Sequence, residues 1–473
     1  MKKLIAKSLL FGAMFCAMSG IVATAQTTNT TGLDAENTAK NAPATNTASG
    51  VLFTLPTVPI VGNPSPVTPR DNLNDQQVAA PRPGNETLDP KYRGFFPIPN
   101  TPVIVMFNAK PRVDMMEDNR NSGNGDRFVT ATIPVQGEPG NGYGGGAQFN
   151  MNAKGSQLKV DVRAPDLPGN LRFYYQNDFY GSGSAAMNYR LQQLYGEFYN
   201  VTAGFTYSIF EDPDVWPDTV DYEGPNSAIF ARQATVRYML PLGDAWQLNF
   251  GVQQPSSQID TGGTVFGATA TPVNHLPDGG MNIRWENAKW GHVQLATILR
   301  DLGAHNSNPV AGNQNVLGWG FNLSSSINVF GHDSVQAQVT GGKGIFAFCN
   351  DNFTYTVPGP VVPYGSFNGG DASYNSAGQL RAMVYVAPMV GYTHQWSEKW
   401  RSTATFGYVN LSNEPDESAV AYHETYYTSL NVVWQIRKRL SVGLEGLYGY
   451  KDQKNGLYGD VWRIQTGLVY SLF

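Results

Sequence analysis

Polar and apolar residues alternate along most of the chain after about residue 101. In the run VTAGFTYSI at 201–209, the odd positions are apolar and the even positions are small or polar. A period of two residues predicts a β-strand with one apolar face. The same pattern recurs at 158–162, 171–179, 281–286, 430–436 and 462–472. No segment after residue 25 carries a sustained 3.6-residue apolar stripe, so the sequence predicts an all-β fold.

The connections between these strands alternate in length. Short turns are expected near 165–170, 242–245, 287–289, 331–334, 397–399 and 437–439. Long Gly/Asn/Pro-rich loops are expected near 115–143, 211–227, 257–280, 302–314 and 344–380, with shorter ones near 412–420 and 452–458. Outer-membrane barrels have short periplasmic turns and long extracellular loops. The rhythm therefore predicts a transmembrane antiparallel β-barrel over residues 96–473.

Counting from residue 101 predicts about 16 strands, with both chain ends on the short-turn side; 14 and 18 strands are the alternatives. Lipid excludes open sheet edges, so such a sheet has to close. Aromatic residues lie towards the predicted strand ends, as in interfacial girdles: Tyr207, Trp285, Trp290, Trp400, Tyr426, Trp434 and Trp462. The alternative is that these rings form the core of a soluble β protein.

The two faces of the strands differ in polarity. About 16 strands enclose an aqueous lumen, so the polar face is expected to point inward and the apolar face towards lipid. The predicted pore-lining arginines are Arg163, Arg172, Arg190, Arg237, Arg284, Arg401 and Arg463, with Lys159, Asp161, Asp178 and Glu286 on the same inner faces. Arg232 breaks the pattern, because it shares a face with Val236; either a bulge intervenes or Arg232 lies at the rim, where an arginine costs about 0–1 kcal/mol.

These inward arginines have two interpretations. In the first, they form a ladder that guides anions, as charged rings do in selective pores. Alternatively, they pair with acids such as Asp161, Asp178 and Glu286 and neutralise the wall.

The long connection at 211–227 is rich in carboxylates. It contains Asp212, Asp214, Asp218, Asp221 and Glu223, together with Trp216 and three prolines. Carboxylates at this density can bind Ca²⁺. They can also fold inward, opposite the arginines, and narrow the pore, which is the arrangement we predict. A solvated surface loop is the alternative.

The composition supports one large sheet. Charged residues make up only 15% of the chain, and mean hydropathy is −0.29 with no long apolar run after the N-terminus, which excludes a multi-span helical membrane protein. Length alone suggests three domains for 473 residues, but a large barrel breaks that rule. Polar inner faces and apolar outer faces together account for the intermediate hydropathy.

The N-terminus resembles a secretory signal. Lysines precede an apolar stretch at 9–22 that ends in Ala23-Thr24-Ala25, so we predict a signal peptide at 1–25; a membrane anchor is the alternative. Its removal deletes three lysines and no acid, which changes the formal charge from −5 to −8 and leaves Cys349 without an intrachain partner. Nucleic-acid binding is not expected of such an acidic exported chain. Residues 26–95, rich in Thr, Asn, Ala and Pro, are predicted to be a flexible extension.

No motif in the sequence indicates catalysis. The six histidines are scattered, no two of them lie at i, i+2 or i, i+4, and neither G-x-S-x-G nor H-E-x-x-H occurs. We therefore predict that the protein is not an enzyme and holds no metal or cofactor. The competing function for the barrel is a plugged structural or adhesive protein, which bulky apolar lumen residues would indicate.

The segment at 202–238 resembles the DcaP-like family of trimeric outer-membrane porins. The residues that carry the resemblance are Ala203-Gly204, Phe210, Asp212, Pro217, Asp221, Gly224-Pro225, Arg232-Gln233 and Arg237-Tyr238, with similar segments at 126–135 and 177–182. The resemblance implies a 16-stranded homotrimeric barrel in the bacterial outer membrane that passes small anionic solutes, especially dicarboxylates, along pore arginines. The chain ends in Phe473, as substrates of the outer-membrane assembly machinery usually do. The coiled-coil extension found in some family members is doubtful here, because residues 26–95 contain no heptads.

Overall fold

The computed structural model describes residues 94–137, 142–182, 187–352 and 369–472. All of them belong to one compact unit, residues 60–473. The predicted signal peptide and residues 26–93 of the predicted extension lie outside the described residues. Within the described part of the chain, no helix is long and apolar enough to cross a membrane.

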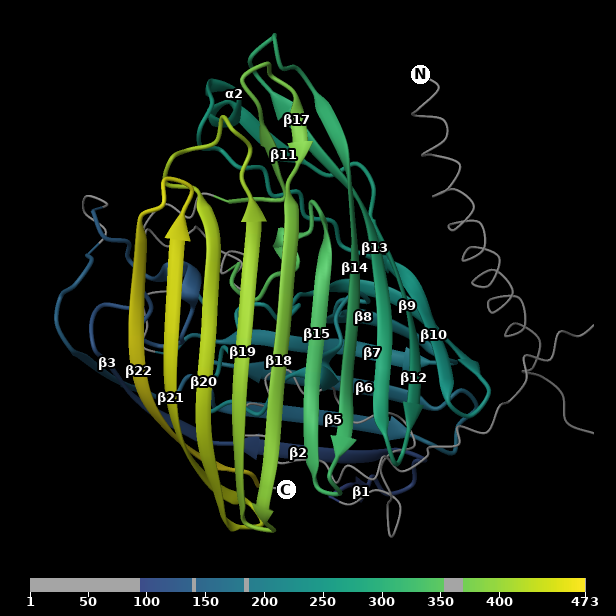
Figure 1. Cartoon of the computed structure of the whole chain (residues 1–473). Coiled ribbons are helices and arrows are strands. Elements are labelled where there is room, and N and C mark those ends of the chain that lie inside the picture. Colours follow the sequence, from purple (N-terminus) through teal and green to yellow (C-terminus); the bar gives the residue numbers. More distant parts are fainter. Residues whose placement is uncertain (1–93, 138–141, 183–186, 353–368, 473) are drawn as a thin grey trace, which may run out of the picture. The chain divides into compact units, whose positions relative to one another are not determined.

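The described residues form strands with a few single-turn helices in the loops (Figure 1). The first group is β1 (Phe96–Pro97), β2 (Ile104–Lys110), β3 (Arg112–Asp118), β4 (Gln148–Asn152), β5 (Gln157–Ala164), β6 (Leu171–Asp178), β7 (Arg190–Phe198), β8 (Val201–Tyr207), β9 (Arg232–Leu242) and β10 (Trp246–Gln253). The second is α2 (Val265–Ala268), β11 (Ala270–Val273), β12 (Asp278–Asn287), β13 (Gly291–Asn306), β14 (Gln314–Val329), β15 (Asp333–Lys343), β16 (Ala372–Tyr374) and β17 (Leu380–Ala382). The last is β18 (Val384–Ser397), β19 (Trp400–Ser412), β20 (Tyr422–Arg437), β21 (Leu440–Gln453) and β22 (Tyr458–Tyr470).

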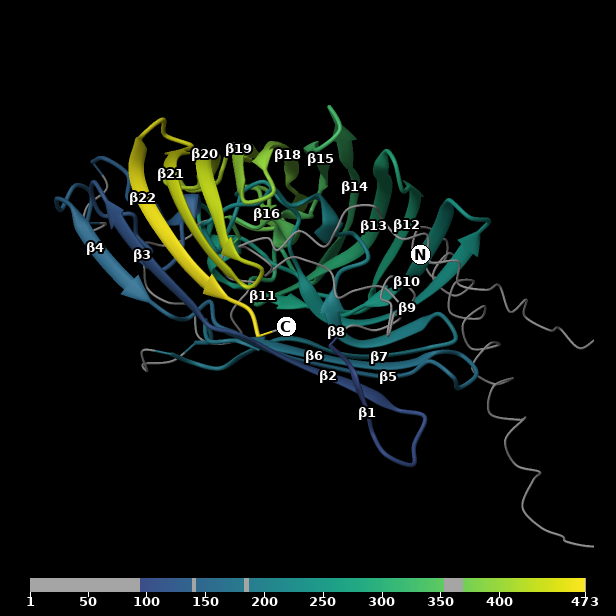
Figure 2. The same cartoon turned by 90° about the horizontal axis from the view of Figure 1, so that it is seen from below.

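Most strands join one large antiparallel sheet. From β5 to β22 each main strand pairs with the next one along the chain, while β11 pairs beside β13, and β16 and β17 pair only with each other. At the far end β22 pairs with β3, and β2 pairs with β5. Only Pro111 separates β2 from β3, and proline has no N–H to continue a ladder. The prediction of an all-β antiparallel fold is confirmed, and Figure 2 shows the sheet curving around the loops.

The two faces of the sheet have the predicted polarity over most of its area. Outward side chains such as Phe321, Leu430 and Ile464 are apolar and exposed, whereas their inward neighbours such as Asn322 and Arg463 are polar and buried. Because alternate side chains of a strand point to opposite faces, this polarity fixes the register of every strand.

Short and long connections alternate as predicted. The short turns confirmed by the structure lie after β5, β9, β12, β14, β18 and β20. Two connections were not predicted: the tight turn at 199–200 between β7 and β8, and the loop at 179–189 between β6 and β7. The turn is easily overlooked, because it has only two residues, Tyr199 and Asn200. Both adopt positive φ angles, of 47° and 65°.

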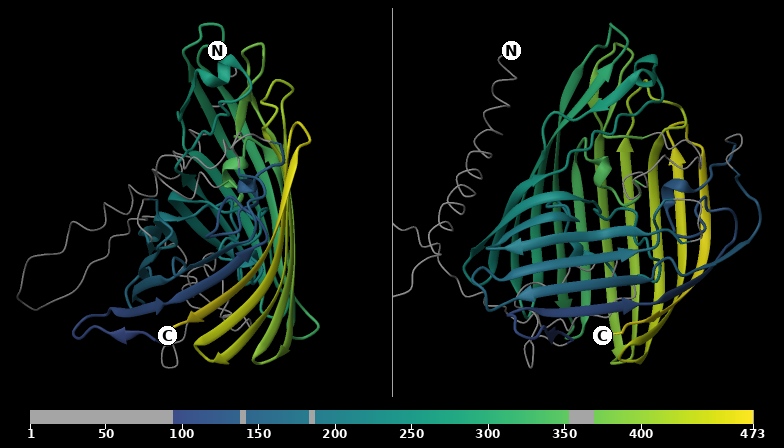
Figure 3. Two further views of the ribbon diagram at one scale, coloured as in Figure 1. Left: turned by 90° about the vertical axis from the view of Figure 1, so that its left-hand side faces the viewer. Right: turned by 180° about the vertical axis from the view of Figure 1, so that it is seen from behind.

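Strand length divides the sheet into two regions. β5–β8 have seven to nine residues each and form what we call the short-strand wall. β13, β14 and β18–β22 have thirteen to sixteen residues and form the long-strand wall. Figure 3 shows that the strands of the short-strand wall run at a steep angle to those of the long-strand wall.

The structure corrects the prediction for Tyr207 and the prediction of a polar inner wall, and it excludes one of the two explanations for Arg232. Tyr207 is not a girdle residue, because it is buried in a cluster with Trp216 and Phe230. The inner wall is not polar throughout: at the long-loop end, inward residues of β18–β20 are apolar and pack against loop residues. Arg232 is the first residue of β9, and the β8–β9 pairing has no register shift, so no bulge intervenes. Its guanidinium lies over the ring of the loop residue Phe230 at 4.6 Å and is buried there.

Candidate functional site

The connection between β8 and β9, residues 208–231, folds against the inner face of the sheet, and we call it the inner loop. Nearly all of its residues are buried. Its first turn is formed by Asp212, whose side chain accepts a hydrogen bond from the N–H of Asp214 at 3.2 Å, with Pro213 in the first helical position. Proline there is preorganised for a helical turn and lacks an N–H that would otherwise be unsatisfied.

Asp212 anchors the start of the inner loop to three strands. Its carboxylate binds Arg284 of β12 at 3.1 Å, His292 of β13 at 2.8 Å and Ser324 of β14 at 2.6 Å. Arg284 also binds Asp214 at 2.7 Å and Glu286 at 3.2 Å. One buried carboxylate thus connects the loop with three consecutive strands.

The middle of the inner loop is held by the opposite part of the wall. Asp218 binds Arg401 of β19 at 2.5 Å, and its carbonyl accepts a hydrogen bond from Asn431 of β20 at 2.7 Å. The N–H of Asp221 donates to Glu445 of β21 at 2.6 Å. The loop therefore spans the space between β12 and β21.

The returning part of the inner loop is attached by aromatic stacking and one further ion pair. Tyr222 stacks on Tyr180 with ring centroids 4.9 Å apart, and Arg112 lies over Tyr222 at 5.0 Å. Glu223 binds Arg127 at 2.7 Å, and Arg127 lies over Tyr180 at 5.0 Å. Stacking of a guanidinium on an aromatic face is favourable, especially away from water.

Six of the seven predicted pore arginines form ion pairs. The pairs among the described residues are Arg163 and Arg172 with Asp161, Arg190 with Asp178, Arg284 with Asp212, Arg401 with Asp218, and Arg463 with Asp118. All six arginine side chains are less than a tenth exposed. For these six residues the structure favours the neutralised wall over the anion-guiding ladder.

Arg237 differs from the other six arginines. It lies on the inner face of β9, is partly exposed, and makes no ion pair within 4 Å among the described residues. Inward residues near it that are also partly exposed include Glu197, Gln247, Asn249 and Glu286, at the short-turn ends of their strands. The inward residues of β18–β22, by contrast, are almost all buried. Water therefore reaches the inner wall mainly along β7–β12.

Glu211 faces this water-exposed strip from the inner loop. One of its oxygens accepts a hydrogen bond from the N–H of Ala231 at 3.0 Å, and the other is buried without a hydrogen bond among the described residues. Burial raises its pKa well above the usual value, although Arg232 and Arg237 act in the opposite direction. Burial thus favours a neutral carboxyl beside two arginines.

The carboxylates of the inner loop are dispersed rather than clustered. Asp212, Asp218 and Glu223 each bind a different arginine, and Asp214 shares Arg284 with Asp212. Within the described residues, no group of three or more His, Cys, Asp or Glu side chains is arranged to hold a metal ion. These carboxylates hold the loop in place, and their geometry gives no support to Ca²⁺ binding.

Asp221 should make the packing of the inner loop depend on pH. Burial raises its pKa to about 7, Glu223 adds to the rise, and Arg463 opposes it. Between about pH 4 and pH 7 the carboxyl of Asp221 is protonated in the packed loop and ionised in the released loop. The free energy that favours the packed loop therefore falls as the pH rises through this range, and it stays constant above about pH 7. We expect the equilibrium between packed and released loop to shift towards release by about tenfold per pH unit below pH 7.

Single-channel recordings at pH 5, 6, 7 and 8 measure this shift as fluctuations of the current. Asp221→Asn should show no such dependence, whereas Asp214→Asn, which changes a partly exposed carboxylate of the same loop, should behave like the unaltered protein. An equal pH dependence in Asp221→Asn would mean that another group is responsible.

A second inward segment, residues 344–352, packs beside the inner loop. Phe346 and Phe348 lie in an apolar cluster with Phe210 and Ile229 of the inner loop. The carboxylate of Asp351, in the same segment, is completely buried and accepts hydrogen bonds from residues of other loops and of β20. The long-loop end of the lumen is therefore partly filled by apolar and hydrogen-bonded loop residues.

Several residues of this arrangement were not predicted from the sequence: Arg112, Arg127, Asp351 and Glu445. Arg112 and Glu445 lie in strands whose alternation does place them on the inner face. Arg127 and Asp351 lie in loops without periodicity, and no local signal distinguishes them from solvated residues.

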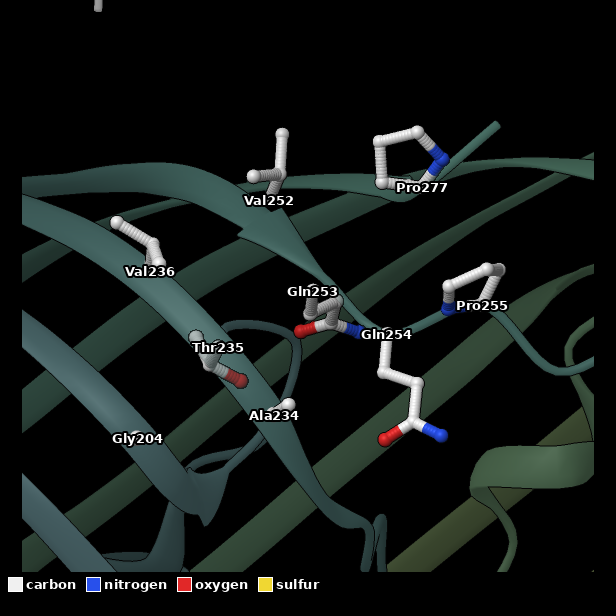
Figure 4. Close-up of a pocket in the computed structure, with 9 residues that line it drawn as sticks. All are labelled: Gly204, Ala234, Thr235, Val236, Val252, Gln253, Gln254, Pro255 and Pro277. Atoms are coloured by element: carbon white, nitrogen blue, oxygen red, sulfur yellow. The ribbon is translucent and has the colours of Figure 1, made fainter. Parts of the chain in front are cut away.

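An apolar groove lies on the outer side of β8–β10. Its lining includes Gly204, Ala234, Val236, Val252 and Pro277 (Figure 4). Gly204 adopts a φ of 140°, and a side chain there would meet the carbonyl oxygen of Leu194 at 2.4 Å, so glycine is required for the strands to approach. The groove is shallow and faces away from the inner loop.

Comparison with known proteins agrees with this architecture. A model of the DcaP outer membrane protein family matches residues 95–471. The chain belongs to this family. It is therefore a protein of the bacterial outer membrane.

Solved structures of outer-membrane proteins align with most of this chain. The outer membrane channel DcaP of Acinetobacter baumannii is 19% identical, with a TM-score of 0.65 over 78% of this chain and 97% of that chain. A loop-deletion mutant of the outer membrane protein OmpT of Vibrio cholerae is 12% identical, with a TM-score of 0.45 over 78% of this chain and 100% of that chain. Pseudomonas putida OprB is 11% identical, with a TM-score of 0.45 over 78% of this chain and 94% of that chain. No curated protein matches the chain by sequence.

Proposed function

We propose that the protein is a diffusion porin for small hydrophilic solutes, with a preference for anions such as dicarboxylates. The observation that carries the proposal is the water-exposed strip of inner wall along β7–β12, which faces the inner loop and contains Arg237. Family membership supports an outer-membrane channel. The dicarboxylate class is taken from the resemblance at 202–238.

Charge along the exposed strip supports an anion preference. The arginines on the other parts of the wall are neutralised by buried carboxylates, so they contribute little field to a passing solute. Arg237 and Arg232 face Glu211, whose burial favours the neutral form. The two acids of the strip are already paired, Glu197 with Arg172 and Glu286 with Arg284. A small anion would therefore meet the positive charge of Arg237, which no described residue pairs, and the inner loop would set the width of its path.

We also propose that the sheet closes as a barrel of sixteen strands. Counting β2 with β3, and β4 with β5, as single interrupted strands makes sixteen strands in sequential pairing. The pairings of β22 with β3 and of β2 with β5 bring the two ends of this series to one segment, residues 104–118. An even strand number agrees with bacterial single-chain barrels.

A homotrimer is the assembly that we propose. A membrane-spanning strand needs about 9–11 residues, and β6–β8, with seven to nine residues, are at or below that length. Such a wall is better covered by protein than by lipid, and the apolar groove on β8–β10 adjoins it. The long-strand wall would then face lipid.

Planar-bilayer recordings test the function. We expect stepwise conductance in groups of three and a reversal potential that favours chloride over potassium, with dicarboxylates acting as blockers. Arg237→Ala should lower the chloride-to-potassium permeability ratio by about two- to fivefold, since one unit charge close to an ion in water is worth about 1 kcal/mol.

Arg237→Lys keeps the charge and should retain the preference. Arg381→Gln, which removes a charge from the exposed middle residue of β17, should not change it. An Arg237→Ala variant with the original reversal potential would show that Arg237 does not select anions. A folded protein that gives no current at all would favour the plugged barrel, which the apolar cluster at the long-loop end also fits.

A further inference from the structure

Basic residues at the short-turn rim are concentrated in two adjacent turns. The β18–β19 turn contains Glu398 and Lys399, and residues 437–439 at the β20–β21 turn are Arg, Lys and Arg. The two turns lie side by side, because the N–H of Gln435 donates to the carbonyl of Lys399 at 2.8 Å. We call residues 398–399 and 437–439 the basic turn pair; it has four cations and one acid.

The side chains of this turn pair are available to a partner. Lys399, Arg437 and Lys438 are exposed, and none of the three side chains makes an ion pair or hydrogen bond within the described part of the chain. Nothing in the fold of the protein itself requires three cations at this position, and their mutual repulsion is unfavourable unless anions are nearby.

Aromatic residues place the turn pair at the edge of the membrane. Trp400 and Trp434 are cross-strand partners that stack with ring centroids 5.3 Å apart and an interplanar angle of 3°. Trp396, on the neighbouring strand, is 64% exposed. Tryptophans of this kind lie at the level of lipid headgroups, and short turns of outer-membrane barrels lie on the periplasmic side. The basic side chains therefore extend into the headgroup layer of the periplasmic leaflet.

The opposite part of the rim has the reverse charge. The turns after β5 and β9 contain Asp166 and Asp244 and no lysine or arginine, and the turn at 199–200 is uncharged. Between the two regions, Lys289 is the one cation of the β12–β13 turn. Basic charge is thus gathered beneath the long-strand wall and is missing beneath the short-strand wall.

We propose that the basic turn pair binds the phosphate headgroup of an anionic phospholipid in the periplasmic leaflet of the outer membrane. Lys399, Arg437 and Lys438 provide the charge, while the Trp400–Trp434 stack and Trp396 pack against the glycerol and upper acyl chain. The proposal depends on the membrane orientation of the barrel and not on its conductance, so it can fail while the porin function stands.

Native mass spectrometry of the full protein in detergent tests the proposal, with phosphatidylglycerol as ligand and phosphatidylcholine, a zwitterionic lipid without net charge, as the comparison. We expect phosphatidylglycerol to bind at least tenfold more tightly. The triple variant Lys399→Gln, Arg437→Gln and Lys438→Gln should lose about a hundredfold in affinity, because each basic residue contributes about fivefold near an anionic surface. Lys289→Gln, the matched control at a neighbouring turn, should lose no more than about fivefold.

Two further measurements do not depend on the variants. Raising the salt concentration from 0.1 to 0.5 M should weaken phosphatidylglycerol binding to the unaltered protein, because salt screens exposed charges. Soluble glycerol phosphate should compete only at far higher concentration, since it has no acyl chain to pack on the tryptophans.

Three outcomes would overturn the proposal. They are equal binding of the two lipids, full retention of phosphatidylglycerol by the triple variant, and competition by glycerol phosphate at the concentration of the lipid, which would indicate a free-phosphate site. Binding to purified cell-wall sacculi that the triple variant loses, with its lipid affinity unchanged, would assign the surface to the cell wall instead.

Discussion

Replacing Asp212 by alanine should release the inner loop from the wall and increase both the mean and the fluctuation of the single-channel current. Burial alone would raise the pKa of Asp212, but His292 and Arg284 hold it below the ordinary value, so the side chain is a carboxylate in the folded loop. Its removal leaves buried cationic and polar partners on β12, β13 and β14 without their acceptor. Breaking a buried ion pair in this way costs about 3–5 kcal/mol.

Denaturant unfolding in detergent and single-channel recording together measure the effect. Asp214→Ala is the matched control, because Asp214 binds the same arginine but its side chain is 29% exposed, and partly exposed pairs contribute only about 0–1 kcal/mol. Asp212→Asn keeps the shape of the side chain and should fall between the two. If Asp212→Ala has the same unfolding free energy and the same current fluctuation as Asp214→Ala, Asp212 does not anchor the loop.

The strands could be predicted from the sequence because their signal is local. Alternation within 201–209 or 462–472 needs only neighbouring residues, and the energy of placing an arginine in lipid fixes which face points outward. The inward direction of Arg163, Arg172 and Arg463 follows from the same pattern. The prediction was weakest where an element is too short for a period, as at the turn 199–200 and in β11, β16 and β17.

Some partners of the inward arginines could be predicted and others could not. Asp161 and Asp178 lie near their arginines on the same inner faces, and the sequence offers both as partners. The loop carboxylates that bind Arg284 and Arg401 could not be predicted, because they are distant in sequence. Asp212 and Arg284 are 72 positions apart, and Asp218 and Arg401 are 183 apart. The pattern does place an arginine in the lumen, but it cannot tell whether a loop brings a carboxylate to it. Both interpretations of the arginine ladder were therefore open. In the structure, acids of the strands pair with Arg163, Arg172, Arg190 and Arg463. The inner loop pairs with Arg284 and Arg401, and no described residue forms an ion pair with Arg237.

The apolar cluster at the long-loop end also depends on contacts between strands and loops that are distant in sequence. Inward residues of β18–β20 at that end are apolar because loop residues Phe210, Phe346 and Phe348 cover them, so they do not line water. In β18 the run 384–390 is apolar on both faces, so the loss of alternation marks where the lumen becomes a packed interior. The sequence does not show which loop residues cover that part of the wall.

Replacing Asp351 by alanine should loosen the long loops more than any substitution of its individual partners. The carboxylate accepts hydrogen bonds from Thr130 at 2.8 and 2.9 Å, from the N–H of Ala131 at 2.8 Å, from Tyr422 at 3.0 Å and from Thr425 at 2.8 Å. These donors belong to the β3–β4 loop and to β20, so one side chain connects three segments. Burial raises the pKa of Asp351, and the hydrogen bonds from Ala131, Thr425, Thr130 and Tyr422 oppose that rise in place of a cation.

The expected cost of Asp351→Ala is about 3–5 kcal/mol of unfolding free energy, because each buried donor left unsatisfied costs about 1–3 kcal/mol and the loops relax in part. Thr130→Val and Thr425→Val each remove one donor without leaving a cavity and should cost only about 0.5–1.5 kcal/mol. Denaturant unfolding gives these values, and limited proteolysis of the folded protein should cut the long loops of Asp351→Ala first. Equal stabilities of Asp351→Ala and Thr130→Val would mean that Asp351 does not connect the segments. Asp351→Asn should not rescue the fold, because its amide group would direct N–H donors at the hydroxyls that now donate to the carboxylate.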